Sequence, residues 1–124
     1  ERGRWVVSDR FSDSTRAYQG WGQGVSLQTL DQLESMVVGS DRPDLTLMLD
    51  IPPEAGLARA RGRGQGADRY EAMDLAFHQR LRAGYRAIAK GEPDRCVLID
   101  ASGDLETVTR AIRSAVRERL AVEF

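Results

Sequence analysis

Residues 9–20 read DRFSDSTRAYQG, a stretch made almost entirely of side chains that form hydrogen bonds. It follows Trp5-Val6-Val7, an apolar run that predicts a buried strand. Ligands of open α/β sheets bind at the carboxyl ends of strands, which is where Asp9 and Arg10 would lie. There an aspartate can orient a metal ion, a water or a hydroxyl, and an arginine can grip a phosphate. The alternative for this pair is a buried salt bridge that caps a following helix.

The other polar residues of this stretch suit recognition of a nucleobase edge and a sugar. They combine three short hydroxyl side chains with a phenol and an amide: Ser12, Ser14, Thr15, Tyr18 and Gln19. Hydroxyl side chains also gather at the N-termini of helices, where they bond to the backbone. That alternative explains the hydroxyls and leaves Tyr18-Gln19-Gly20 unexplained.

Residues 59–71, RARGRGQGADRYE, form a second cluster that suits phosphate chemistry. Four arginines fall within eleven residues of it: Arg59, Arg61, Arg63 and Arg69. Because glycines interrupt the cluster, we expect a flexible, positive flap that closes over a polyphosphate and stabilises a transferring phosphoryl group. A solvated basic loop and a nucleic-acid contact are the alternatives. Asp68 and Glu71 argue against the second, since they reduce the positive charge.

Short apolar runs and amphipathic stripes supply the elements that must position these clusters. The runs predict strands and the stripes predict helices: strands at 5–7, 45–51 and 96–100, and helices at 27–37, 53–61, 73–88 and 105–120. Ser26, Pro53 and Asp104 are suitable residues to begin three of the helices. The alternation of helices with strands that are apolar on both faces predicts an α/β fold with a parallel sheet.

The composition predicts one soluble globular domain, with 124 residues of which 41% are hydrophobic and 30% charged. A formal net charge of −1 favours neither nucleic acid nor an anionic membrane as a partner. Cys96 is the only cysteine, which excludes an internal disulfide and fits a reducing cytosol. Since no apolar run reaches the ~20 residues that span a bilayer, we expect a cytoplasmic protein without a membrane partner.

Several motifs, in order along the chain, resemble those of the thymidylate kinase family. Asp9-Arg10-Phe11, Ser14 and Ala17-Tyr18-Gln19-Gly20 resemble the family signature DR(Y/H/F)xxSxxAYQG. Further matching segments follow at 42–46, 49–50, 53–57, 68–71 and 99–101. The resemblance implies a P-loop nucleoside monophosphate kinase fold, a three-layer α/β/α domain with a parallel sheet. It also implies a homodimer that transfers the γ-phosphoryl group of ATP to dTMP, giving dTDP, with Mg²⁺ as the cofactor.

The resemblance assigns catalytic roles to three residues. Arg10 would hold the dTMP phosphate, and Asp9 would help to organise the metal and phosphate region. Arg63 would stabilise the charge of the transition state, in the manner of bacterial members that carry this arginine in the lid. The lid, residues 59–71, would close over ATP through Arg59, Arg61 and Arg63, with Asp68 and Arg69 anchoring its far end.

The same resemblance assigns the acceptor site to residues 9–20. Ser14 and Thr15 would face the thymine edge. Tyr18 would crowd the 2′ position of the sugar and so favour deoxyribose, with Gln19 nearby.

The chain lacks the family's first motif, GxxGxGK(S/T), which cradles the ATP phosphates. Its single lysine, Lys90, lies near the end of a predicted helix. We therefore expect residues 1–124 to form the C-terminal part of one kinase domain, without its N-terminal strands and P-loop, and to be inactive alone. A related P-loop deoxynucleoside kinase and a non-catalytic fragment that dimerises or binds nucleic acid are the alternatives.

Overall fold

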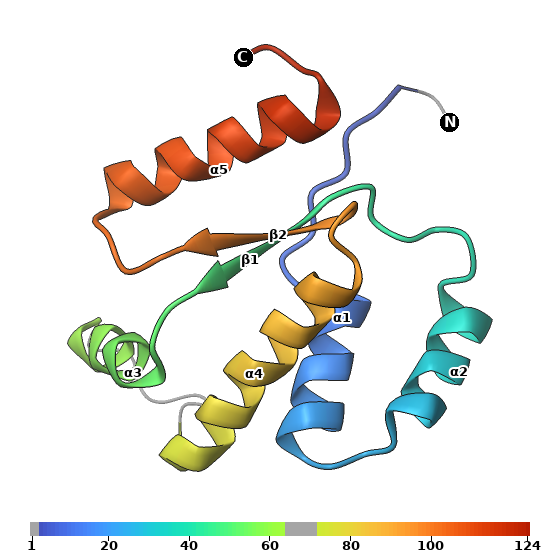
Figure 1. Cartoon of the computed structure of the whole chain (residues 1–124), viewed down its shortest axis with the longest axis vertical. Coiled ribbons are helices and arrows are strands. Elements are labelled where there is room, and N and C mark those ends of the chain that lie inside the picture. Colours follow the sequence, from blue (N-terminus) through green and yellow to red (C-terminus); the bar gives the residue numbers. More distant parts are fainter. Residues whose placement is uncertain (1–2, 64–71) are drawn as a thin grey trace.

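The computed structural model describes residues 3–63 and 72–124, so Asp68, Arg69 and most of the expected lid lie outside the described residues. Helices predominate around a short sheet (Figure 1). In chain order the elements are α1 (Ser12–Thr15), the π-helical segment η1 (Arg16–Gly22), α2 (Leu27–Val37), β1 (Thr46–Asp50), α3 (Pro53–Gly62), α4 (Leu75–Gly91), β2 (Cys96–Asp100) and α5 (Leu105–Leu120). The strands predicted at 45–51 and 96–100 and the four predicted helices are confirmed.

The two strands pair in parallel, in a register that runs from Thr46 opposite Cys96 to Asp50 opposite Asp100. Helices α4 and α5 both contact the sheet and lie on opposite sides of it (Figure 1). Because successive side chains of a strand alternate between faces, Met48 and Cys96 pack toward α4 while Ile99 lies on the other face. The helices thus cover both faces of a parallel sheet, which confirms the predicted α/β class.

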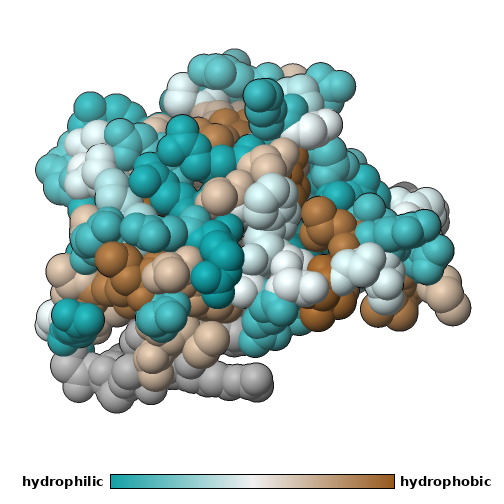
Figure 2. Space-filling view, turned by 60° about the horizontal axis from the view of Figure 1, so that its bottom comes forward, coloured by the Kyte–Doolittle hydropathy of each residue, from teal (hydrophilic) through white to brown (hydrophobic). Residues whose placement is uncertain are grey.

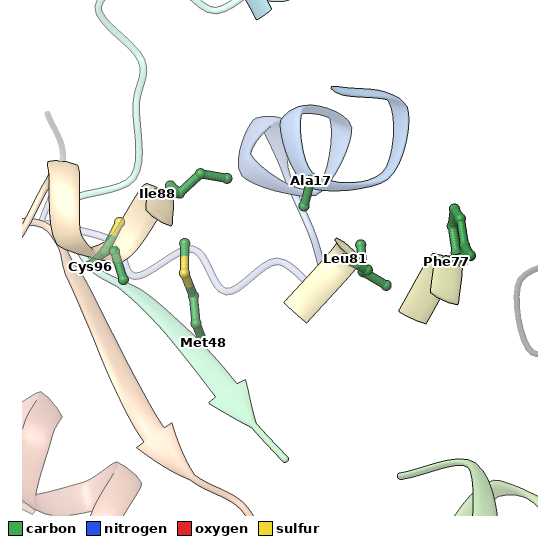
Figure 3. Packing of buried hydrophobic residues seen from close by; sticks show 7 residues of the cluster. Ala17, Met48, Phe77, Leu81, Ile88 and Cys96 are labelled. Atoms are coloured by element: carbon green, nitrogen blue, oxygen red, sulfur yellow. The ribbon is translucent and has the colours of Figure 1, made fainter. Parts of the chain in front are cut away.

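The hydrophobic core lies between α4, the sheet and η1. Its buried side chains gather around α4 in Figure 3, and they are Ala17, Met48, Phe77, Leu81, Ile88, Ala89 and Cys96. Phe77 is completely buried, and Tyr18 and Tyr85 pack against the cluster from its edge. The apolar stripe of α4 is therefore the central support for the segment that contains residues 9–20.

Local capping explains where the helices begin and end. Asp74 and Asp104 each accept a hydrogen bond at 2.8 Å from the backbone N–H three residues later, at the starts of α4 and α5. Pro53 occupies the first turn of α3, where its missing N–H costs nothing. Gly39 has φ +56° just past the end of α2, a conformation that favours glycine.

The predicted strand at 5–7 is wrong. Trp5, Val6 and Val7 form no regular element, and their side chains are 63%, 87% and 92% exposed. A strand requires a neighbour to accept its ladder of hydrogen bonds. Among the described residues β1 and β2 pair only with each other, so nothing pairs with residues 5–7. The apolar run at 5–7 does not itself indicate whether a neighbouring strand will pair with it.

Residues 12–22 form a helix that packs unusually closely on α4. A Cβ atom at Gly22 would lie 2.6 Å from the Phe77 ring, and one at Gly84 would lie 2.6 Å from Trp21. Both glycines are therefore required for the close approach of η1 to α4. Ser12, Ser14 and Thr15 occupy α1, but the Ser12 and Ser14 hydroxyls bond to the side chains of Glu34 and Tyr85 and not to the helix backbone.

A buried ion pair joins α1 to the sheet. Asp13 is 4% exposed, and Arg95 binds both of its carboxylate oxygens, at 2.7 and 2.9 Å. Thr46 donates to the same carboxylate at 3.3 Å and accepts from Arg95 at 2.8 Å. One charged pair thus links α1, the start of β1 and the residue before β2.

Glu92 extends this pair into a larger network. It accepts hydrogen bonds from Arg95 at 2.8 Å, Arg42 at 2.7 Å and Arg16 at 3.3 Å. Arg42 also binds Glu34 of α2, to which Ser12 donates at 2.9 Å. The network therefore ties α1 and α2 to the turn between α4 and β2.

The acid sensitivity of folding should depend measurably on Glu92. Burial raises the pKa of this carboxyl group, but the hydrogen bonds from Arg95 and Arg42 outweigh burial and lower the pKa from 4.5 to about 2. A lowered pKa in the folded state contributes stability above the unfolded pKa, and this contribution is lost as the pH falls toward 2. From about pH 6 to about pH 3 the loss amounts to ~2 kcal/mol of the free energy of unfolding.

Urea unfolding of the wild type and of Glu92→Gln at both pH values measures this loss. The wild type should lose ~2 kcal/mol more than the variant, which has no carboxyl group to protonate. Equal losses in the two proteins would contradict the assignment.

Candidate functional site

Arg10 has a strained backbone and a directed side chain. Its φ is +67°, a conformation that side-chain-bearing residues seldom adopt and that concentrates at functional sites. Ser8 donates a hydrogen bond to the Arg10 carbonyl at 2.9 Å. The guanidinium carbon lies 4.9 Å from the centre of the Tyr18 ring, within the range of a cation–π contact. Arg10 is exposed to solvent, and the Tyr18 ring limits the position of its guanidinium.

Tyr18 and Tyr85 form an aromatic pair that contacts α1 through Ser14. Their rings meet edge to face, with centres 6.4 Å apart, and Tyr18 also lies 6.2 Å from Phe77. The Tyr85 hydroxyl shares a hydrogen bond with Ser14 at 2.9 Å. Burial raises the pKa of Tyr85, so this phenol stays protonated at neutral pH. The contact fixes the orientation of the Ser14 hydroxyl.

A surface hollow of about 510 Å³ opens between α1 and α2. Its lining combines arginines, hydroxyls and apolar side chains with one carboxylate, that of Glu34: Arg10, Phe11, Ser12, Ser14, Thr15, Arg16, Leu30, Leu33, Glu34, Val37 and Val38. The structure thus brings together Arg10, Ser14 and Thr15 from the predicted acceptor set. A cation beside hydroxyls and apolar walls can bind a phosphate together with a flat, partly apolar group.

Three other predicted residues lie outside this lining. Tyr18 faces the core and Arg10, and Gln19 is half-buried in η1. Asp9 is exposed beside Arg10. In residues 3–63 and 72–124, no group of three or more histidine, cysteine, aspartate or glutamate side chains converges as a metal site. A single carboxylate next to an exposed arginine fits the needs of Mg²⁺, which keeps most of its waters and takes one or two carboxylates plus phosphate oxygens.

The described arginines of the predicted lid lie on and just after α3. Arg61 and Arg63 are exposed. Arg59 instead donates hydrogen bonds to the loop that follows β2, at the carboxyl ends of the strands. Its direct contact with ATP stays a prediction, as do the roles of Arg61 and Arg63.

Sequence reasoning missed the residues that hold the site in place. Asp13 carries no distinct signal within the polar stretch, and no sequence motif includes Arg95. Tyr85 lies within the predicted helix at 73–88, where a hydroxyl carries no signal of its own. These partners lie 71 and 82 residues from Ser14 and Asp13, so no local pattern connects them.

Comparisons with known proteins agree on one family. The sequence profile of the family described as thymidylate kinase matches residues 1–112. Thymidylate kinase from Caulobacter vibrioides is 56% identical over 119 residues, covering 96% of this chain and 57% of the relative. The enzyme from Nitrobacter hamburgensis is 52% identical over 124 residues, covering 98% of this chain and 54% of the relative.

A solved structure matches at the level of the fold and of the sequence. The crystal structure of thymidylate kinase from Ehrlichia chaffeensis superposes with a TM-score of 0.62 at 30% identity, covering 89% of this chain and 49% of that one. The chain spans about half the length of the curated relatives it matches, and the match is to their C-terminal portion. No helix within the described residues is both long and apolar enough to cross a membrane.

The order of motifs, the parallel α/β fold and these matches agree, and they do not favour a deoxynucleoside kinase or a non-catalytic module. The chain belongs to the thymidylate kinase family.

Proposed function

We propose that this chain supplies the acceptor site and lid of a thymidylate kinase, which transfers the γ-phosphoryl group of ATP to dTMP and releases dTDP and ADP. The observation that carries the proposal is the hollow between α1 and α2, where Arg10 meets Ser14 and Thr15. A phosphate oxygen of dTMP attacks the γ-phosphorus, so catalysis consists of positioning and of stabilising negative charge.

Each residue of the acceptor segment has a distinct task in this proposal. Arg10 binds the dTMP phosphate and is aimed by the Tyr18 ring beneath it. Ser14 and Thr15 bond to the thymine edge, with Ser14 oriented by Tyr85. In this proposal Tyr18 crowds the 2′ position of the sugar, which favours deoxyribose, and Gln19 follows it in η1.

The arginines of the lid, residues 59–71, act on ATP in the same proposal. Arg63 neutralises the charge that develops on the transferring phosphoryl group, Arg59 and Arg61 close over ATP with it, and Asp68 and Arg69 anchor the far end of the lid. Mg²⁺ arrives with ATP, where it offsets phosphate charge, and Asp9 is the carboxylate nearest Arg10 in sequence that can orient its waters. We place this reaction in the cytoplasm.

The choice of acceptor tests the function directly in the full-length gene product. dTMP should be phosphorylated at least ~100-fold more efficiently than thymidine, because thymidine has no phosphate for Arg10 to bind. Arg10→Gln should raise the KM for dTMP by ~10–100-fold, since a hydrogen bond to a charged group contributes ~1.5–3 kcal/mol.

Steady-state kinetics with both acceptors measure these effects, and Arg110→Gln on the exposed face of α5 is the matched control. Preference for thymidine, or an unchanged KM for dTMP in Arg10→Gln, would contradict the proposed acceptor site.

We propose further that the enzyme is a homodimer that pairs through α2. The apolar side chains Leu33, Met36 and Val37 of this helix are 51%, 83% and 82% exposed. Figure 2 shows several hydrophobic patches, coloured brown, among the hydrophilic residues of one face of the molecule. A contiguous exposed apolar face on a helix is a common dimerisation surface.

Light scattering of the full-length gene product tests this interface. The wild type should have the mass of two chains, and Met36→Asp should shift the mass toward one chain at micromolar concentration. Leu105→Asp, which changes an equally exposed apolar residue on α5, should leave the dimer intact. A monomeric wild type would refute the interface.

A further inference from the structure

Loop 101–104, which joins β2 to α5, is anchored to the strand ends by its own backbone. The Ala101 N–H donates to the Asp50 carbonyl of β1 at 2.8 Å. Ser102 donates from its backbone N–H at 2.9 Å and from its hydroxyl at 2.5 Å to the Asp100 carboxylate. Asp104 then caps α5. These bonds leave the carbonyl groups of the loop to be satisfied from elsewhere.

Arg59 of α3 satisfies three consecutive carbonyls of this loop. Its Nη1 donates to Ala101 O at 2.5 Å, and its Nη2 donates to Ser102 O at 2.7 Å and to Gly103 O at 3.0 Å. Three of the five N–H donors of the guanidinium are thus used on one short loop. A side chain of this length loses considerable rotamer freedom when it is held. The three hydrogen bonds must offset that loss, and together they hold the Arg59 side chain against the loop.

The location gives this contact a functional meaning. The loop lies at the carboxyl ends of two parallel strands, which is where ligands bind in open α/β sheets. The helix that carries Arg59 also carries Arg61 and leads directly into Arg63. Arg59 therefore connects the start of the arginine-rich segment to the strand-end loop.

We propose that Arg59 is a positioning residue: it fixes the backbone of loop 101–104 relative to α3, and it acts on ATP through that loop. This inference deepens the proposed kinase function and rests on it. A direct phosphate ligand would leave the loop unchanged when removed, whereas a positioning residue would release it.

Amide hydrogen exchange of the full-length gene product, without any nucleotide, tests whether Arg59 fixes the backbone of loop 101–104. In Arg59→Gln the amides of Ala101 and Ser102 should exchange about tenfold faster, since their hydrogen bonds depend on the loop's position. Arg59→Lys keeps one cation and should give an intermediate rate. Arg61→Gln, on the same helix, should leave both rates unchanged. Unchanged rates in Arg59→Gln would overturn the proposal.

Steady-state kinetics of the same variants test the functional part. Arg59→Gln should raise the KM for ATP by about fivefold or more, with the KM for dTMP unchanged and kcat within about twofold, and Arg59→Lys should restore part of the ATP affinity. A large fall in kcat without faster exchange would make Arg59 a catalytic phosphate ligand and overturn the proposal. If the gene product does not phosphorylate dTMP, the kinase function fails, while the exchange rates still decide whether Arg59 holds the loop.

Discussion

The ion pair between Asp13 and Arg95 is the constraint on which the rest of the structure depends. An almost fully buried carboxylate is unfavourable unless it is paired and hydrogen-bonded. Asp13 achieves both through Arg95 and Thr46, which lie where the two strands begin. The helix that presents the acceptor residues is therefore fixed to the sheet by one charged contact, and Glu92 extends that contact to Arg42 and Arg16.

The residues proposed to bind the nucleotide are different from the residues that fix α1 to the sheet. Arg10, Ser14 and Thr15 line the hollow between α1 and α2, while Asp13 points away from it into the ion-pair network. Tyr18 connects these two groups of residues, because its ring packs on the core and also lies next to the Arg10 guanidinium. A polar helix can therefore be fixed firmly to the sheet and still line a hollow at the surface.

Local patterns predicted the elements whose partners are near in sequence. The apolar stripe of 105–120 with its Asp104 cap, and the apolar runs at 45–51 and 96–100, are complete signals by themselves. The run at 5–7 predicted a strand wrongly, because strand formation depends on a neighbour that the run does not encode. Arg95 and Tyr85 could not be found either, since their roles arise only when distant segments meet. The motif residues of the acceptor site were identifiable by type, whereas their supports were not.

The free energy of unfolding of Asp13→Asn tests the central claim most directly. The substitution keeps the shape of the side chain and leaves Arg95 buried beside a neutral partner. Urea unfolding at neutral pH should show a loss of about 3 kcal/mol, the lower end of the range for breaking a buried pair, because Glu92 still contacts Arg95. Glu106→Gln, which breaks an exposed pair on α5, should cost less than ~0.5 kcal/mol. A loss in Asp13→Asn as small as that of this control would contradict the account.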